Sequence, residues 1–167
     1  MARAIEKEMK NFRIAFEKLE GVSEEKMRTG KVRPGYAFCS IHIIFDIKMN
    51  GAFTRQARLV ADGHKTQPPT SMTYSSAVSR DSVRIALITA ALNSPEVSAY
   101  DIGNAYLNAN CQEKLWPVKG PEFGSERGSV RIVARALYGL KSSGAAWRAT
   151  LAETMNALGY QLLRLFD

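Results

Sequence analysis

The segment Val97-Ser98-Ala99-Tyr100-Asp101-Ile102-Gly103-Asn104-Ala105-Tyr106-Leu107-Asn108 is the best starting point for interpreting this chain. An apolar run with β-propensity leads into the lone carboxylate of Asp101. Because a glycine and an aromatic residue follow closely, the pattern predicts a strand at 97–102 and a tight turn that aims Tyr106 back toward the strand end. An ordinary strand-to-loop junction, in which Asp101 and Asn104 bond to turn backbone, fits the same residues.

Length and composition are those of a globular chain. It has 167 residues, of which 46% are hydrophobic, enough for one domain with a core or for part of a larger one. No apolar run approaches the roughly 20 residues of a membrane span, and the charged N-terminus, 1–10, lacks a signal-peptide apolar region. We therefore expect an intracellular protein, cytoplasmic or nuclear, with no membrane partner.

Positive charge is concentrated in two stretches that contain no acidic residue. The net charge is +7, and these stretches are 47–61, which includes Arg58, and 127–150, which includes Lys141. A basic balance of this kind suits a polyanionic partner, and a solvated basic face gives the same pattern.

The cysteine content favours neither disulfides nor a metal site. Cys39 and Cys111 are far apart in the sequence, and two cysteines do not form a disulfide framework. Cys39 and His42 form a lone C-x-x-H pair, whereas zinc needs about four ligands. We expect both thiols to be buried and reduced.

The N-terminal part predicts a helix followed by a β-hairpin. Apolar residues at steps of three and four over 3–19 indicate an amphipathic helix, and Ser23 is placed to cap a short second helix. Alternating residues on both sides of Asn50-Gly51 predict a basic hairpin over 41–60. The hairpin either only packs against the rest of the chain or projects as a clamp on phosphates.

The C-terminal part predicts further helices and short strands. The expected elements are a loop at 62–76, a helix from Ser79 or Asp81 to 93–95, strands at 97–102, 115–118 and 130–134, and a helix at 144–158. The first helix should carry a core stripe of Val83, Leu87 and Ala91. The serines before the second helix should cap it, and Gly159 should end it.

Three motifs gain meaning from their order along the chain. They are Gln56-Ala57-Arg58-Leu59-Val60-Ala61-Asp62-Gly63, then 101–108 as quoted above, then Leu137-Tyr138-Gly139-Leu140-Lys141. In this order, and with a similar linking segment at 74–84, they resemble the reverse transcriptase of copia-type retrotransposons. The resemblance covers roughly residues 36–160.

The resemblance implies an α+β fold, namely a partial right-hand polymerase in which an antiparallel sheet has flanking helices. Three regions are then expected. Residues 1–35 form an N-terminal helical segment, 36–96 a fingers-like β-hairpin and helix, and 97–167 a partial palm that stops before the second aspartate motif.

The resemblance also implies roles for individual residues. Asp101 corresponds to the first metal-binding carboxylate, and the Ile102 carbonyl would lie beside one of two Mg²⁺ ions, which hard oxygen ligands hold best. Tyr106 corresponds to the aromatic residue against the sugar of the incoming nucleotide, where it favours deoxynucleotides. Arg58 would meet the triphosphate, since guanidinium forms bidentate bonds with phosphate.

The third motif is implied to contact nucleic acid. Tyr138, Gly139 and Lys141 correspond to a turn that meets the templating pair and the primer-template backbone, where glycine permits close approach. The implied partners are an RNA or DNA primer-template and deoxynucleotide triphosphates.

The sequence departs from the family in its carboxylates. The family has two further aspartates on a later hairpin, and Asp167 is the last residue here. We therefore expect a fragment that is inactive alone, without the thumb, RNase H, integrase and protease regions. The alternatives are a non-catalytic basic nucleic-acid-binding module, and a structural protein that only shares the strand-turn-helix pattern. The binding module predicts salt-dependent nucleic-acid binding without metal-dependent synthesis, and the structural protein predicts neither.

Overall fold

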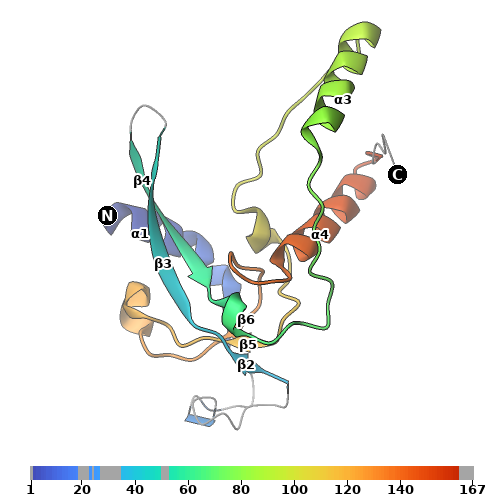
Figure 1. The fold of residues 1–167 in the computed structure, drawn as a ribbon. Coiled ribbons are helices and arrows are strands. Elements are labelled where there is room, and N and C mark those ends of the chain that lie inside the picture. Colours follow the sequence, from blue (N-terminus) through green and yellow to red (C-terminus); the bar gives the residue numbers. More distant parts are fainter. Residues whose placement is uncertain (1, 19–22, 24, 27–34, 50–52, 162–167) are drawn as a thin grey trace.

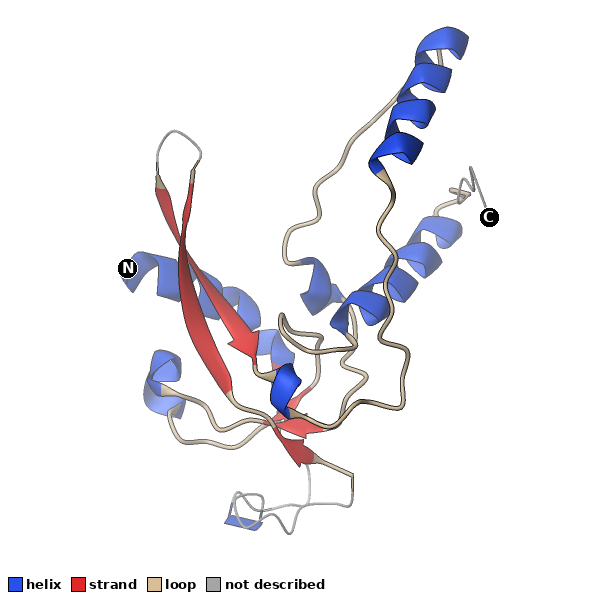
Figure 2. Cartoon of the chain, viewed as in Figure 1, coloured by secondary structure: helices blue, strands red, loops and turns tan. Residues whose placement is uncertain are grey.

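The chain mixes helices and strands, as the computed structural model in Figures 1 and 2 shows. The structure describes residues 2–18, 23, 25–26, 35–49 and 53–161. The helices are α1 (Ala2–Phe12), α3 (Arg80–Asn93) and α4 (Ser143–Ala157), with 3₁₀ turns at Arg13–Ala15, Gly63–Lys65, Ala105–Asn108 and Pro121–Glu126. The strands are β1 (Phe16–Glu17), β2 (Ala37–Phe38), β3 (Ile41–Lys48), β4 (Thr54–Ala61), β5 (Leu115–Trp116) and β6 (Ile132–Val133). The expected mixture of helices and strands is confirmed.

The predicted hairpin is confirmed. Strands β3 and β4 run antiparallel, from Ile41 opposite Ala61 to Lys48 opposite Thr54. Along β4 the alternate residues from Ala57 to Ala61 are buried, whereas the far end of β3 is exposed, because only the near end of the hairpin lies against the body (Figure 1). The Asn50-Gly51 turn lies outside the described residues.

The predicted helix over 3–19 is shorter than expected. Helix α1 ends at Phe12, and Phe16 lies instead in β1, antiparallel to β6 and opposite Val133. Both phenylalanines are buried, so the apolar spacing correctly indicates burial and wrongly extends the helix. Pairing with β6 satisfies the Phe16 backbone in an extended conformation, in place of the i to i−4 hydrogen bond of a continued helix. Leu19 lies outside the described residues, as does most of the short helix expected after Ser23.

The core lies where the hairpin, β1, β5, β6 and the 137–140 turn meet. Its fully buried members include Phe12, Leu59 and Leu137. The three small sheets each have two strands, of which β1–β6 and β3–β4 are antiparallel and β2–β5 is parallel. The expected antiparallel sheet is thus replaced by separate pairs.

The strands expected at 115–118 and 130–134 form, but they are short. Strand β5 stops before Pro117, whereas the predicted strand ran to Val118, and Val118 forms a single antiparallel bridge with Val130. Proline removes a backbone donor, which interrupts the hydrogen-bond ladder at this point.

Helix α3 confirms its predicted start and contradicts its predicted core stripe. Ser79 caps the helix, since its Oγ accepts the backbone N–H of Ser82 at 3.0 Å. Yet no residue of α3 is buried, and Leu87 is 52% exposed. In Figure 1 the helix stands apart from the body, at the end of two extended segments. The stripe therefore has no core to pack against among the described residues.

The strand predicted at 97–102 does not form. Residues 94–102 have no regular secondary structure, and Val97, Tyr100 and Ile102 are all exposed. A strand needs a neighbour to receive its backbone hydrogen bonds. No described residue pairs with this segment, so its β-propensity alone does not make it a strand.

Helix α4 matches the predicted range and ends before Gly159, whose φ of +85° is left-handed. The predicted serine caps are wrong. Ser142 Oγ donates to the buried carboxylate of Glu113 at 2.7 Å, and Ser143 Oγ donates to the Leu137 carbonyl at 2.6 Å. These hydroxyls fasten the start of α4 to the body instead of capping it. No described helix has both the length and the apolar character needed to cross a membrane.

Candidate functional site

A cavity of about 580 Å³ lies between α1, β4, the turn at 101–104 and the 138 turn. Four of the predicted site residues line it, namely Arg58, Asp101, Ile102 and Tyr138. They come from three separate motifs, so the fold brings together residues up to 80 positions apart. Lys7 and Glu8 of α1 also line this cavity, and sequence reasoning did not assign them to the site.

Arg58 extends from β4 toward an aromatic ring. Its guanidinium carbon lies 5.9 Å from the centre of the Tyr138 ring, within the range of a cation–π contact. The side chain forms no ion pair with any described residue, and Arg58 is exposed. A guanidinium held in this way keeps its five N–H donors available for an anion.

Tyr106 belongs to the same group through Tyr138. The two ring centres are 4.8 Å apart at an interplanar angle of 50°. Asn104, with a φ of +51°, reverses the chain immediately before the 3₁₀ turn that carries Tyr106. The predicted tight turn is therefore present. The Tyr106 ring packs against the Tyr138 ring and not against a strand end, because residues 97–102 do not form the predicted strand.

Asp101 offers a free carboxylate at the edge of the cavity. It is exposed and makes no hydrogen bond or ion pair with any described residue. Carboxylate and carbonyl oxygens are the donor types that Mg²⁺ prefers, so Asp101 and Ile102 fit this ion in kind. In number they do not complete a site, and the described residues contain no group of three or more His, Cys, Asp or Glu that could hold a metal. They suffice only with phosphate oxygens and water as further ligands.

Gly139 makes a close backbone contact within the chain. Its φ is +91°, and a Cβ there would lie 2.1 Å from the Ala61 carbonyl oxygen. A Cβ on Gly63 would in turn lie 2.4 Å from the Gly139 carbonyl oxygen. The Ala61 N–H donates to the Tyr138 carbonyl at 2.8 Å between these two glycines. Both glycines therefore let the first and third motifs dock on each other.

Lys141 is also engaged within the chain. Its ammonium group donates to the carbonyl of Thr66, in the loop that follows the first motif. This bond ties the third motif to the 62–76 loop. The side chain is half-buried, so only part of it is accessible from outside.

Asp62 is a buried hub that sequence reasoning did not single out. Its carboxylate accepts from Lys65 Nζ at 2.7 Å and from Ser40 Oγ at 2.6 Å, and it lies 3.2 Å from His42 Nδ1. The hydrogen bonds from Lys65 and Ser40 lower the pKa of Asp62 to about 2. His42 therefore pairs with Asp62. The only signal in the sequence was an Asp-Gly step at a strand end.

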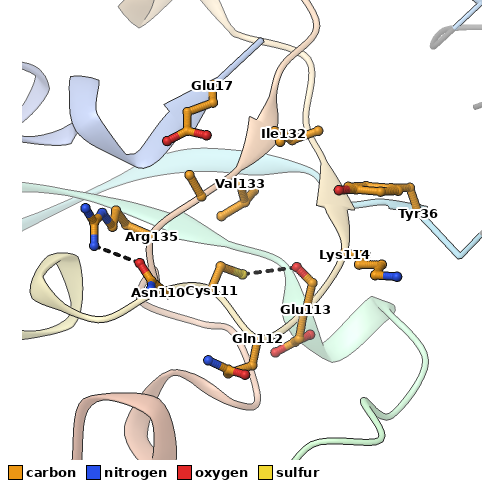
Figure 3. Close-up of a pocket in the computed structure, with 11 residues that line it drawn as sticks. Glu17, Tyr36, Asn110, Cys111, Gln112, Glu113, Lys114, Ile132, Val133 and Arg135 are labelled. Atoms are coloured by element: carbon orange, nitrogen blue, oxygen red, sulfur yellow. Dashed lines mark hydrogen bonds between the residues drawn. The ribbon is translucent and has the colours of Figure 1, made fainter. Parts of the chain in front are cut away.

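A second cavity, of about 350 Å³, lies beside β6 and the 110–114 loop (Figure 3). Two of its polar side chains are engaged within its wall, since Arg135 donates to Asn110 Oδ1 at 2.8 Å and the Cys111 thiol donates to the Glu113 carbonyl at 3.2 Å. Burial raises the pKa of Cys111 to about 11, so the thiol stays protonated and is a poor nucleophile. Both cysteines are free, and the fold gives this cavity none of the predicted site residues.

The sequence comparisons bear on the same three motifs. A family model described as "Reverse transcriptase (RNA-dependent DNA polymerase)" matches residues 40–165. The Transposon Ty1-BL Gag-Pol polyprotein of Saccharomyces cerevisiae is 36% identical over 110 residues, which are 65% of this chain and 6% of that protein. The Truncated transposon Ty1-A Gag-Pol polyprotein of the same organism shows the same identity over the same length, which is 9% of it.

This chain therefore spans less than a tenth of the length of these relatives. No solved structure matches it significantly. The family model covers about three quarters of the chain and includes all three motifs. The chain belongs to the reverse transcriptase (RNA-dependent DNA polymerase) family, among its copia-type members.

Proposed function

We propose that this chain provides the nucleotide-binding and template-binding part of an RNA-directed DNA polymerase. The observation that carries the proposal is the shared cavity of Arg58, Asp101, Ile102 and Tyr138, which unites residues from three motifs. Residues 36–96 would then act as fingers and 97–167 as part of a palm in a right-hand arrangement, with 1–35 as an N-terminal helical segment.

In this proposal Arg58 binds the phosphates of a deoxynucleotide triphosphate, because its guanidinium is charged, exposed and in no ion pair with a described residue. Tyr106 lies against the sugar and excludes a 2′-hydroxyl. Tyr138, Gly139 and Lys141 meet the primer-template. The contact between Arg58 and the Tyr138 ring supports a common role for the first and third motifs in the cavity.

Asp101 and the Ile102 carbonyl would hold Mg²⁺ together with phosphate oxygens. When bound, the ion would neutralise phosphate charge in the cavity. The chain's own contribution is to keep the Asp101 carboxylate exposed and unpaired, so that it is available at the cavity edge.

Primer-template binding tests the proposal. Fluorescence anisotropy of a labelled RNA–DNA primer-template should show affinity that falls as salt rises, by about 0.9 in log affinity per log salt for each phosphate contact on duplex DNA. Arg58→Ala should weaken binding and flatten this slope. Arg3→Ala and Arg13→Ala are charge-matched controls, because neither residue lines the cavity. If the controls weaken binding as much as Arg58→Ala, the site assignment is wrong.

A non-catalytic nucleic-acid-binding module is the second candidate. The observation in its favour is that the described residues contain no group of three or more His, Cys, Asp or Glu that could hold a metal. We expect no primer extension by this chain alone with Mg²⁺ or Mn²⁺ and deoxynucleotides. Robust synthesis that Asp101→Ala abolishes would show that the chain is a complete catalyst.

A further inference from the structure

Helix α1 lies outside the residues that the family model matches, yet it forms one wall of the cavity. Its buried residues, Met9 and Phe12, face the body and place the helix against β4. On this placement, Lys7 and Glu8 reach the cavity that Arg58 lines. The helix therefore contributes to the site as well as to the core.

Glu8 covers the free edge of β4. One edge of β4 pairs with β3, and at the other edge every second residue presents its backbone N–H. The Leu59 N–H donates to Glu8 Oε1 at 3.1 Å, and two residues later the Ala61 N–H donates to the Tyr138 carbonyl at 2.8 Å. Glu8 and the 138 turn thus accept successive backbone N–H groups along the same free edge of β4, in the segment that follows Arg58.

The charges around the cavity favour an anion. Three cations line it, Lys7, Arg55 and Arg58, against the two carboxylates of Glu8 and Asp101. Burial raises the pKa of Glu8 above its usual 4.5, and the Leu59 N–H and the positive charges of Arg58 and Lys7 oppose this shift. Lys7 is exposed and forms no ion pair with a described residue, so its ammonium group is available.

We propose that α1 is part of the binding site, in which Lys7 contacts phosphate groups of the same ligand as Arg58 and Glu8 positions the β4 backbone beside Arg58. This inference rests on the proposed function above. The shared chemistry is phosphate, which either a nucleotide triphosphate or a nucleic-acid backbone supplies. Glu8 touches no ligand in this proposal and acts only as a positioning residue.

Lys7→Ala and Lys10→Ala form the matched pair for the test. Both lysines are exposed on α1, and only Lys7 lines the cavity. Anisotropy is measured with a labelled primer-template at several salt concentrations and, separately, with a fluorescent deoxynucleotide triphosphate. Lys7→Ala should weaken binding several-fold in at least one arm, and with the primer-template it should flatten the salt slope by up to about one unit, as one lost phosphate contact does. Lys10→Ala should leave both nearly unchanged.

The two arms distinguish the source of the phosphate. A loss confined to the triphosphate assigns Lys7 to the nucleotide, and a loss confined to the primer-template assigns it to the backbone. If Lys7→Ala equals Lys10→Ala in both arms while Arg58→Ala weakens binding, the inference about Lys7 is wrong and the proposed function stands. If Arg58→Ala is also without effect, both fail.

Glu8→Gln and Glu8→Ala test the positioning role. The glutamine keeps an oxygen that can accept the Leu59 N–H, and the alanine removes it. Glu8→Ala should weaken binding, and Glu8→Gln should restore it to the wild-type level or above, because one negative charge is gone from the cavity wall. Melting temperatures show that each variant is folded. Equal losses for both variants at unchanged melting temperature would contradict the positioning role.

Discussion

The hairpin and helix α3 carry equally clear local signals and have opposite fates in the fold. Strand β4 is hydrogen-bonded to β3 on one edge and is met by α1 and the 138 turn on the other. Helix α3 is well capped at Ser79, yet it buries no residue and stands apart from the body in Figure 1. The difference is the presence of a partner, because burial and pairing supply most of the stability of an element of this length.

A substitution of one leucine in each region gives the largest expected contrast. Leu59 in β4 is fully buried, whereas Leu87 in α3 is 52% exposed. Leu59→Ala should lower the free energy of unfolding by about 2–5 kcal/mol through lost burial and a cavity. Leu87→Ala should cost about 0.5 kcal/mol or less, as surface changes do. Urea unfolding measures both. Similar losses would mean that α3 is packed against something in solution.

Substitution of two glycines distinguishes the energetic cost of a left-handed backbone from the cost of a collision with neighbouring backbone. Gly139 and Gly159 both have a left-handed φ, +91° and +85°, but only a Cβ at Gly139 would collide, with the Ala61 carbonyl. Gly159→Ala should cost about 1 kcal/mol for the conformation alone. Gly139→Ala should cost at least about 3 kcal/mol, because β4 and the 138 turn must also move apart. Equal costs in urea unfolding would contradict the docking of the two motifs.

The Asp62 carboxylate, which precedes Gly63, gives a smaller effect on stability that depends on pH. The pKa of Asp62 is about 2 in the folded state against an ordinary value of 3.8. The stabilisation is therefore fully present above about pH 4 and is lost as the pH falls through about 2. Asp62→Asn should lower the melting temperature at pH 5, and the gap to wild type should close toward pH 2. A gap that stays constant would show that Asp62 is not hydrogen-bonded as described.

The smallest expected effect is local to α3. Ser79→Ala removes the acceptor for the Ser82 N–H and should destabilise the start of the helix by about 1 kcal/mol. Because no residue of α3 is buried, the global unfolding midpoint should not move. Hydrogen exchange should accelerate for the first α3 amides and stay unchanged for Leu59. A shift of the global midpoint would show that α3 is coupled to the core.

Several local patterns gave correct predictions. The alternation around Asn50-Gly51 predicted the β3–β4 hairpin, Ser79 predicted the start of α3, and Gly159 predicted the end of α4. The motifs that resemble a copia-type reverse transcriptase likewise predicted the family, which the family match over 40–165 confirms. Each of these depends on residues close together in the sequence.

The features that the sequence did not predict depend on contacts with segments far away along the chain. The 97–102 segment has β-propensity and remains irregular, because no described strand lies beside it. The apolar spacing through Phe16 continues the helical pattern, yet Phe16 pairs with Val133, more than a hundred residues away. Glu8 lies outside the apolar face of the amphipathic helix predicted over 3–19, and its carboxylate accepts the Leu59 N–H at the cavity.

The sequence alone therefore determined which side chains the candidate site has available, through Arg58, Asp101 and the aromatic residues of the motifs. Tertiary structure decided which of them meet, since a backbone hydrogen bond or a buried face forms only where a distant segment supplies the other half. Gly63 and Gly139 illustrate the division. Their identity is written in the motifs, and their purpose, a backbone approach too close for any Cβ, exists only in the folded chain.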